Sequence, residues 1–210
     1  MKSFTILKSI VAPLVEDDIN TDQIIPSEYL KDIHADLKFG LFAYQRRDPN
    51  GISQKSFVLE KEEFLNANIL LTGKNFGCGS SREHAVWALQ EFGFQCIIAK
   101  SFSELFKNNC LKNGILTIEL QEDIFIELER EITGNFEVKY LTVDLPKQAL
   151  FNDEGTVICN FNIDLNTKLI LMEGIDEIDM TLKEIDSVSL WESKNDFNML
   201  LQKPIAKFSN

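Results

Sequence analysis

Residues 75–84, NFGCGSSREH, form the densest group of side chains in the chain that could perform chemistry. Two glycines allow positive φ angles and close approach of a ligand to the backbone. The segment leads into a predicted helix, whose first N–H groups are unpaired and carry about half a positive charge. Two hydroxyls and a guanidinium add donors, which suits a carboxylate or a phosphate. The candidate anion-binding residues are Gly77, Cys78, Gly79, Ser80, Ser81 and Arg82.

The same segment also has a purely structural interpretation. Ser80 and Glu83 fit the S-x-x-E spacing of a helix capping box, which needs no ligand. A cap explains neither the two glycines nor a second serine followed by arginine. The two interpretations are compatible, because a capping serine accepts a hydrogen bond and keeps its own proton.

Cys78 raises the alternative of a cysteine nucleophile, because helix N-termini lower thiol pKa values. Its base would have to be His34 or His84, the two histidines of the chain. His84 lies on the predicted helix and is expected to face sideways in a structural role. The segment also lacks the G-x-S-x-G pattern of a nucleophile elbow and the GK[ST] ending of a P-loop. A Cys–His pair is therefore disfavoured.

A second candidate segment is residues 17–26, DDINTDQIIP, which gathers carboxylates and an amide. Such a group could suggest a calcium loop, but the Gly at position six and the Glu at position twelve of an EF-hand are absent. The plainer interpretation is an Asx-turn ahead of a strand or helix.

The elements around the first segment predict a parallel layer of strands and helices. Apolar runs predict strands at 68–72, 95–99 and 115–120, and helices are predicted at 81–92 and 101–111. The first helix has apolar residues at i, i+3, i+4 and i+7 and stops at Gly93. Ser101 and Glu104 have capping-box spacing at the start of the second. Strands that alternate with helices imply parallel pairing.

The remaining segments complete one α/β domain over residues 1–210, with a C-terminal helical tail. Before the parallel layer we predict a strand at 4–14, a polar stretch at 16–31 too irregular for a helix, a short helix and loop at 31–54, and a helical turn at 62–66. After it we predict a helix at 122–132, an antiparallel meander of strands at 136–145, 147–151 and 156–163 with a turn at 152–155, and a helix at 180–193.

Composition excludes several classes of function. The 21 Lys and Arg against 33 Asp and Glu give a net charge of −12, which argues against nucleic acid and anionic membranes as partners. No apolar run approaches the roughly 20 residues of a membrane span, and a signal peptide is not expected. The cysteines, Cys78, Cys96, Cys110 and Cys159, form no CxxC pair. We therefore expect no metal centre in this chain. We expect a cytoplasmic protein whose thiols are reduced.

The two candidate segments resemble the small subunits of 3-isopropylmalate dehydratase, in the aconitase superfamily. The strings that carry the resemblance are NTDQIIP at 20–26, YLK at 29–31, NFGCGSSREH at 75–84, WAL at 87–89, FGF at 92–94, SF at 101–102, residues 108–113 and EGID at 173–176. They span nearly the whole chain, and the string at 75–84 is highly specific. Residues 32–54 depart from the usual bacterial pattern.

The resemblance implies a three-layer β/β/α swivelling domain with a mixed sheet, which closes over a large catalytic subunit. It places a [4Fe–4S] cluster in that partner and no cofactor or metal in this chain. The implied reaction interconverts 2-isopropylmalate and 3-isopropylmalate by loss and re-addition of water, in leucine biosynthesis. Such dicarboxylates suit an anion pocket built without a metal.

The resemblance also assigns roles to single residues. It implies that Ser80 is the general base and that Ser81 and Arg82 contact substrate carboxylates. It places Thr21 and Asp22 near the active site.

Lys31 is expected at the entrance of the loop that reads the substrate's side group. A small apolar side group needs an apolar wall. The candidates for that wall are Ile24, Ile25, Tyr29 and Leu30.

Two alternatives stay open. Relatives of this fold process citrate, homocitrate-derived acids, maleate and methylated malates, so a small subunit of a related hydro-lyase is the first. A non-catalytic binding module is the second, and it predicts that Ser80 can be replaced without consequence.

Overall fold

A computed structural model describes residues 2–30, 36–48, 50–134, 138–175, 178–179, 182 and 184–194. The chain divides into two compact units, Met1–Gly174 and Ile175–Asn210. The first unit contains the sheet and all elements discussed below except one helix. The second contains α9 (Ile185–Lys194), which lies largely within the predicted C-terminal helix.

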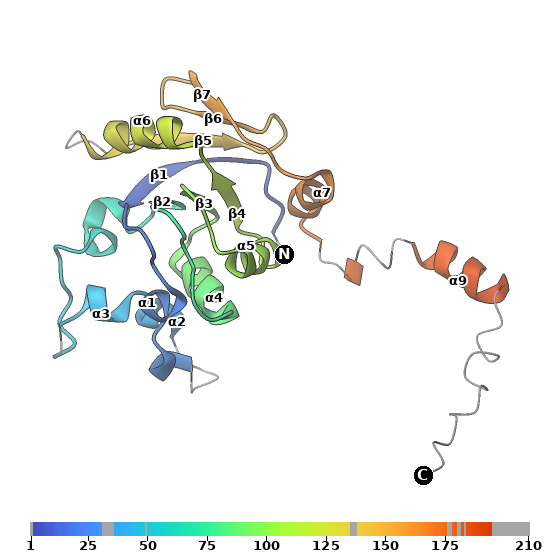
Figure 1. Ribbon diagram of the computed structural model, residues 1–210, viewed down its shortest axis with the longest axis horizontal. Coiled ribbons are helices and arrows are strands. Elements are labelled where there is room, and N and C mark those ends of the chain that lie inside the picture. Colours follow the sequence, from blue (N-terminus) through green and yellow to red (C-terminus); the bar gives the residue numbers. More distant parts are fainter. Residues whose placement is uncertain are drawn as a thin grey trace, which may run out of the picture. The chain divides into compact units, whose positions relative to one another are not determined.

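The first unit is built on a seven-stranded sheet in the order β4-β3-β2-β1-β5-β6-β7 (Figure 1). Its strands are β1 (Ile6–Leu14), β2 (Ile69–Thr72), β3 (Cys96–Ala99), β4 (Leu116–Glu119), β5 (Tyr140–Asp144), β6 (Ala149–Phe151) and β7 (Val157–Asn160). The pairs from β1 to β4 are parallel, and those from β1 to β7 through β5 and β6 are antiparallel. The predicted parallel layer and antiparallel meander are confirmed.

Short and long helices connect these strands. The helices of this unit are α1 (Thr21–Ile24), α2 (Leu37–Gly40), α3 (Ala43–Arg46), α4 (Glu83–Phe92), α5 (Glu104–Lys112), α6 (Glu122–Thr133) and α7 (Leu165–Glu173), with 3-10 turns η1 (Ser27–Leu30), η2 (Val58–Glu60) and η3 (Glu62–Phe64).

β1 joins the two halves of the sheet because its two ends pair with different strands. Residues 11–14 run parallel to β2, whereas residues 6–10 run antiparallel to β5. A nine-residue strand can serve both partners where the four-residue strands cannot. The parallel and antiparallel halves therefore form two layers linked through one long strand.

The inner parallel strands β2 and β3 are buried on both faces. Leu70 of β2 and Ile97 of β3 pack in a core with α4 and α5. Their neighbours Leu71 and Ile98 point the opposite way, into a second core with α6 and the strands β5–β7. Figure 1 shows α4 and α5 on one side of β2–β4, and α6 with β5–β7 on the other. Continuous apolar runs are what such two-sided burial requires, and the predicted α/β class with β/β/α layering is confirmed.

Residues 16–31, predicted to be non-helical, contain α1 and η1, so that prediction was wrong. The Asn20 side chain accepts a hydrogen bond from the Gln23 N–H, and the Gln23 side chain accepts one from the Asn20 N–H, each at 2.9 Å. This capping box stabilises one helical turn that is too short to show apolar periodicity. The interpretation of segment 17–26 as an Asx-turn ahead of a strand or helix is confirmed, with Asn20 as the capping residue and α1 as the helix.

Two other local patterns mislead. Helix α7 was not predicted, because Leu171 is its one buried residue and no apolar face is visible in the sequence. The predicted capping box of Ser101 and Glu104 does not form. α5 begins after Ser103, and the Ser101 hydroxyl instead accepts a hydrogen bond from the Asn75 N–H at 2.9 Å.

Candidate functional site

The two candidate segments, 57 to 60 positions apart in sequence, lie side by side in the structure. The Gly77 N–H donates to the Ile19 carbonyl at 2.8 Å, and the Thr21 N–H donates to the Cys78 carbonyl at 2.9 Å. Asn20 and Cys78 form a parallel bridge outside the main strands. The loop after β2 is therefore bound along the segment that follows β1, because β1 and β2 are parallel neighbours whose carboxyl ends meet at one sheet edge.

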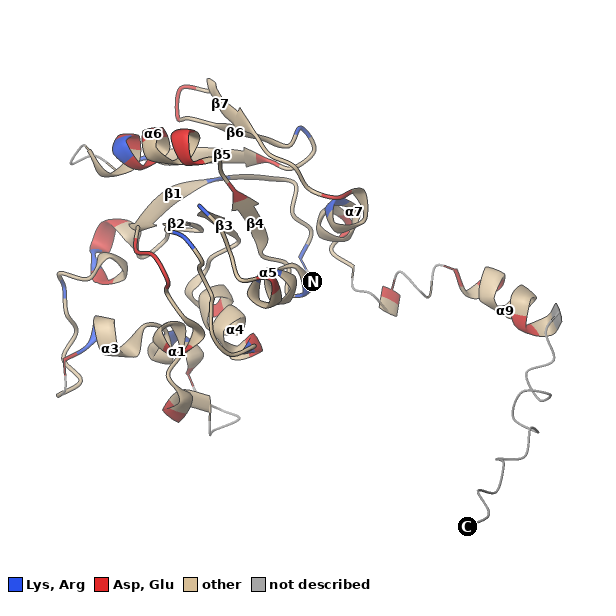
Figure 2. Cartoon of the chain, in the orientation of Figure 1, with Lys and Arg blue, Asp and Glu red and all other residues tan. Residues whose placement is uncertain are grey.

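Acidic residues where the chain leaves β1 hold the start of the loop, and Figure 2 shows them as a red segment. The Asp17 carboxylate accepts a hydrogen bond from the Lys74 N–H at 2.7 Å. The Asp18 carboxylate accepts one from the Asn75 amide at 2.7 Å. Both carboxylates thus bind donors of the chain itself, which supports the structural interpretation of this segment over a calcium loop.

Gly77 lets the loop pass directly over α5. Its φ of +74° belongs to the left-handed region, and a Cβ there would lie 2.1 Å from Cγ of Phe106. Phe76 packs edge-on against Phe106 with ring centroids 5.3 Å apart. Gly79 also has a positive φ, +91°, but faces more open space. A side chain at position 77 would push the loop away from its support.

Thr21 fixes the backbone at Ser80. Thr21 is buried, and its hydroxyl donates to the Ser80 carbonyl at 2.9 Å. Ser80 and Ser81 are both exposed, and the Ser81 hydroxyl accepts a hydrogen bond from the Asn109 amide at 3.4 Å. The two hydroxyls are thus presented to solvent by a backbone that is held from behind.

The capping box of Ser80 and Glu83 does not form. α4 begins at Glu83, and its N-cap is Arg82 in extended conformation without a side-chain cap bond. The hydrogen bond from Thr21 to the Ser80 carbonyl instead fixes the backbone just before the first turn of α4. The Ser80 side chain is therefore not used by the cap.

Arg82 forms an ion pair with Asp22 through its Nη1 atom. The same nitrogen lies 3.5 Å from the Ile25 carbonyl. The Arg82 side chain is only 20% exposed, whereas that of Asp22 is 56% exposed. Among the contacts of the described residues, Nε and Nη2 of Arg82 are not engaged. A planar guanidinium can use that edge for a bidentate contact with a carboxylate.

Cys78 and His84 have different partners. The Cys78 thiol donates to the Asp18 carbonyl at 3.5 Å. The His84 ring packs on Trp87 with centroids 4.6 Å apart. Within the part of the chain that the structure describes, no interaction joins Cys78 to His84, which favours the structural role for His84.

The predicted apolar wall is only partly available. Ile24 and Ile25 are fully buried in the core behind α1 and cannot contact a substrate, so their inclusion was wrong. Tyr29 and Leu30 are half-buried at the core surface. Lys31 lies outside the described residues.

Tyr44 and Glu28 are rim residues that the sequence did not reveal. Tyr44 on α3 is 63% exposed, and the charge of Glu28 of η1 acts on its hydroxyl. Desolvation and the charge of Glu28 raise the pKa of Tyr44, with a smaller contribution from Asp22. Tyr44 is therefore close enough to Glu28 and Asp22 to feel their charges. A single tyrosine in a polar loop carries no motif that could have singled it out.

The described residues contain neither a cluster of metal ligands nor a helix that could span a membrane. Over the described ranges, no group of three or more His, Cys, Asp or Glu side chains is placed to hold a metal ion. Cys96, Cys110 and Cys159 are buried and form no disulfide bond. Among the helices of the described residues, none combines the length and apolarity needed to cross a bilayer.

The class of the protein follows from comparison with known families. Residues 1–123 match the aconitase C-terminal domain family. This range includes both candidate segments and the strands β1–β4 that carry them. The site described above therefore lies within the range that matches the aconitase C-terminal domain family.

Similar proteins identify the family within this class. The small subunit of 3-isopropylmalate dehydratase from Xanthobacter autotrophicus is 41% identical over 198 residues, covering 92% of this chain and 96% of the relative. The protein of that name from Afipia carboxidovorans is 42% identical over 199 residues, with the same coverage. A crystal structure of 3-isopropylmalate dehydratase from Methanocaldococcus jannaschii is similar with a TM-score of 0.58 and 25% identity, covering 90% of this chain and 98% of that one. The chain therefore belongs to the family of 3-isopropylmalate dehydratase small subunits.

Proposed function

We propose that this chain is the small subunit of a 3-isopropylmalate dehydratase that works only together with a large subunit. The complex interconverts 2-isopropylmalate and 3-isopropylmalate in leucine biosynthesis by removing and re-adding water. The observation that carries the proposal is the arrangement of Ser80 and Arg82. An exposed hydroxyl stands two residues from a guanidinium with a free edge, on a loop held by Thr21 and Gly77.

Arg82 binds a substrate carboxylate in this proposal. Asp22 and the Ile25 carbonyl bind its Nη1 atom, so among the described residues the edge formed by Nε and Nη2 remains without a partner. Ser81 adds a hydroxyl on the same loop. The substrate can also approach the backbone closely at Gly77, Cys78 and Gly79. Asp22 thus acts as an orienting partner rather than as a competing anion.

Ser80 removes the proton next to a substrate carboxylate. Free serine is a very weak acid, so its alkoxide must be stabilised by nearby N–H donors and by the charge of Arg82. An alkoxide is in return a strong base, as a carbon acid of high pKa demands. A general base must stand within hydrogen-bond reach of the proton that it removes. The hydrogen bond from Thr21 to the Ser80 carbonyl helps to keep the Ser80 backbone, and with it Oγ, in place.

The large subunit supplies the other half of the chemistry. The described cysteines of this chain are not placed to hold an iron–sulfur cluster. A [4Fe–4S] cluster on the large subunit would act as a Lewis acid on the leaving hydroxyl. This chain's own contribution is binding, orientation and the proton held at Ser80 Oγ.

Reconstitution with a large subunit tests the proposal. Ser80→Ala should lower kcat about 10²- to 10⁴-fold while thermal stability and subunit association stay unchanged. Ser103→Ala is the matched control, because Ser103 precedes α5 without a side-chain cap bond. Arg82→Lys should reduce kcat/KM strongly, because a bidentate contact is lost.

Two results would contradict the proposal. Full activity of Ser80→Ala would point to the non-catalytic binding module. Activity confined to citraconate or homoaconitate would instead identify a related hydro-lyase. A further check is the isolated chain, which should contain no iron after purification.

A further inference from the structure

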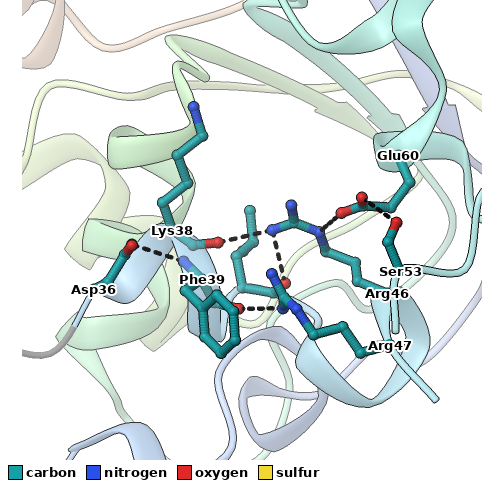
Figure 3. Close-up of polar contacts among 8 residues, drawn as sticks. Asp36, Lys38, Phe39, Arg46, Arg47, Ser53 and Glu60 are labelled. Atoms are coloured by element: carbon teal, nitrogen blue, oxygen red, sulfur yellow. Dashed lines mark hydrogen bonds and ion pairs between the residues drawn. The ribbon is translucent and has the colours of Figure 1, made fainter. Parts of the chain in front are cut away.

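A buried ion pair lies outside the anion pocket and has no part in the chemistry above. Arg46 at the end of α3 binds Glu60 at the end of η2, and their side chains are 8% and 15% exposed (Figure 3). The Ser53 hydroxyl donates to the second carboxylate oxygen of Glu60 at 2.6 Å. Burial alone would raise the pKa of Glu60, but the hydrogen bonds from Ser53 and Arg46 outweigh it and lower the pKa.

The other end of Arg46 holds α2. Its Nη1 atom donates to the Lys38 carbonyl at 2.7 Å and to the Leu41 carbonyl at 3.3 Å. These carbonyls lie at the C-terminal end of α2, where a helix leaves its acceptors unpaired and attracts cations. Arg47 donates to the Phe39 carbonyl at 2.6 Å and stacks on the Phe39 ring at 3.6 Å. Two successive arginines thus fasten one short helix (Figure 3).

α2 in turn supports the remaining part of the apolar wall. A Cβ on Gly40 would lie 2.8 Å from Cγ of Tyr29 and 2.6 Å from Cδ1 of Ile25, so Tyr29 packs directly on the α2 backbone. The ring of Tyr29 lies 6.1 Å from that of Phe39. Any displacement of α2 therefore changes the position of Tyr29.

The pair of Arg46 and Glu60 is charged, although it is buried. A buried ion pair adds little stability compared with apolar residues of the same size, but it fixes geometry through directional bonds. Here those bonds connect η2, α3 and α2, three short elements that share no regular ladder. Such an ion pair is suited to fixing the position of α2, even where it adds little to the stability of the fold.

We propose that the Arg46–Glu60 pair is a positioning device that fixes α2 behind Tyr29 and thereby sets discrimination by the size of the substrate's side group. This inference rests on the proposed function. Neither residue touches the substrate in it, and the ion pair acts only through α2 and Tyr29.

The test uses two hydrations that differ only in the alkyl group. Isopropylmaleate forms when isopropylmalate loses water, and citraconate is the corresponding methyl compound. Both are measured with the reconstituted two-subunit enzyme by loss of the double-bond absorbance. In Arg46→Lys and Glu60→Gln, kcat/KM for isopropylmaleate should fall about 10- to 100-fold, mainly through KM, as expected for a misfitted apolar pocket. The value for citraconate should change less than threefold.

The controls separate positioning from folding. Glu60→Gln keeps an acceptor for Arg46 if Arg46→Lys fails to fold, and thermal melts accompany both variants. Lys107→Met on α5 removes a partly exposed ion pair with Glu119 of β4 and should leave both substrates unaffected. An equal loss on both substrates, or an unchanged ratio in folded variants, would overturn the inference. A wild-type enzyme that hydrates neither compound would instead count against the proposed function.

Discussion

The contact between Gly77 and Phe106 allows a quantitative test of how the loop is supported. In Gly77→Ala, the new Cβ would lie 2.1 Å from the Phe106 ring, with further ring and Cβ atoms within 2.6 Å. An L residue in left-handed conformation costs about 1–2 kcal/mol. Overpacking of a filled site costs about 1–3 kcal/mol more. We therefore expect Gly77→Ala to lower the free energy of unfolding by about 2–5 kcal/mol.

Gly155→Ala is the matched control for this prediction. Its φ of +81° is similar, but nothing lies within 4 Å of the added Cβ. Only the conformational cost of about 1–2 kcal/mol should appear there. For a domain of this size, 1 kcal/mol shifts Tm by about 2–4 °C. Thermal melts followed by circular dichroism should thus show a loss of about 4–20 °C for Gly77→Ala and about 2–8 °C for the control.

A double-mutant cycle completes the test. In a Phe106→Ala background most of the clashing atoms are gone, so Gly77→Ala should cost about 1–3 kcal/mol less than in the wild type. Equal Tm losses for Gly77→Ala and Gly155→Ala would refute the reasoning, and so would a cycle without coupling. The reconstituted activity of Gly77→Ala should also fall, because the displaced loop carries Ser80.

Two further predictions concern the cap of α7 and the thiols. Asp164→Ala removes the acceptor of the Thr167 N–H at 3.0 Å and should cost about 1 kcal/mol. The hydrogen bonds from Thr167 lower the pKa of Asp164, so this stabilisation is complete above about pH 4 and disappears as the pH falls through the lower folded value. The Tm difference from wild type should vanish in acid, and a difference that persists would exclude the cap as its source. A thiol reagent should label Cys78 first, since Cys96 and Cys110 are fully buried and burial raises their pKa; fast labelling of either would contradict this.

Sequence reasoning succeeded where the signal is local. The runs that became β2 and β3 are almost entirely apolar, because a strand covered on both faces has no solvent side. The segment 75–84 stood out because glycines, hydroxyls and a guanidinium rarely occur together in a plain connection. The short strands and the site loop could therefore be located without coordinates.

Sequence reasoning failed where the deciding partner is distant in the chain. Ser80 and Glu83 have the spacing of a cap, yet Thr21 binds the Ser80 carbonyl and the helix starts later. The link between Arg82 and Asp22 spans 60 positions. Nothing in the order of residues indicates either partner. The capping-box spacing of Ser80 and Glu83 therefore does not predict the structure, because a long-range hydrogen bond determines it.

The same long-range bonds have a consequence for folding. Hydrogen bonds that join the loop after β2 to the segment after β1 connect residues 57 to 60 positions apart. Closing so long a chain is entropically costly until β1 and β2 have paired in register. A nascent or partly folded chain can thus form α4 and α5 while its anion pocket does not yet exist. If the site binds a dicarboxylate as proposed, that binding requires the topology of the sheet to be complete, and the ligand will selectively stabilise the finished fold.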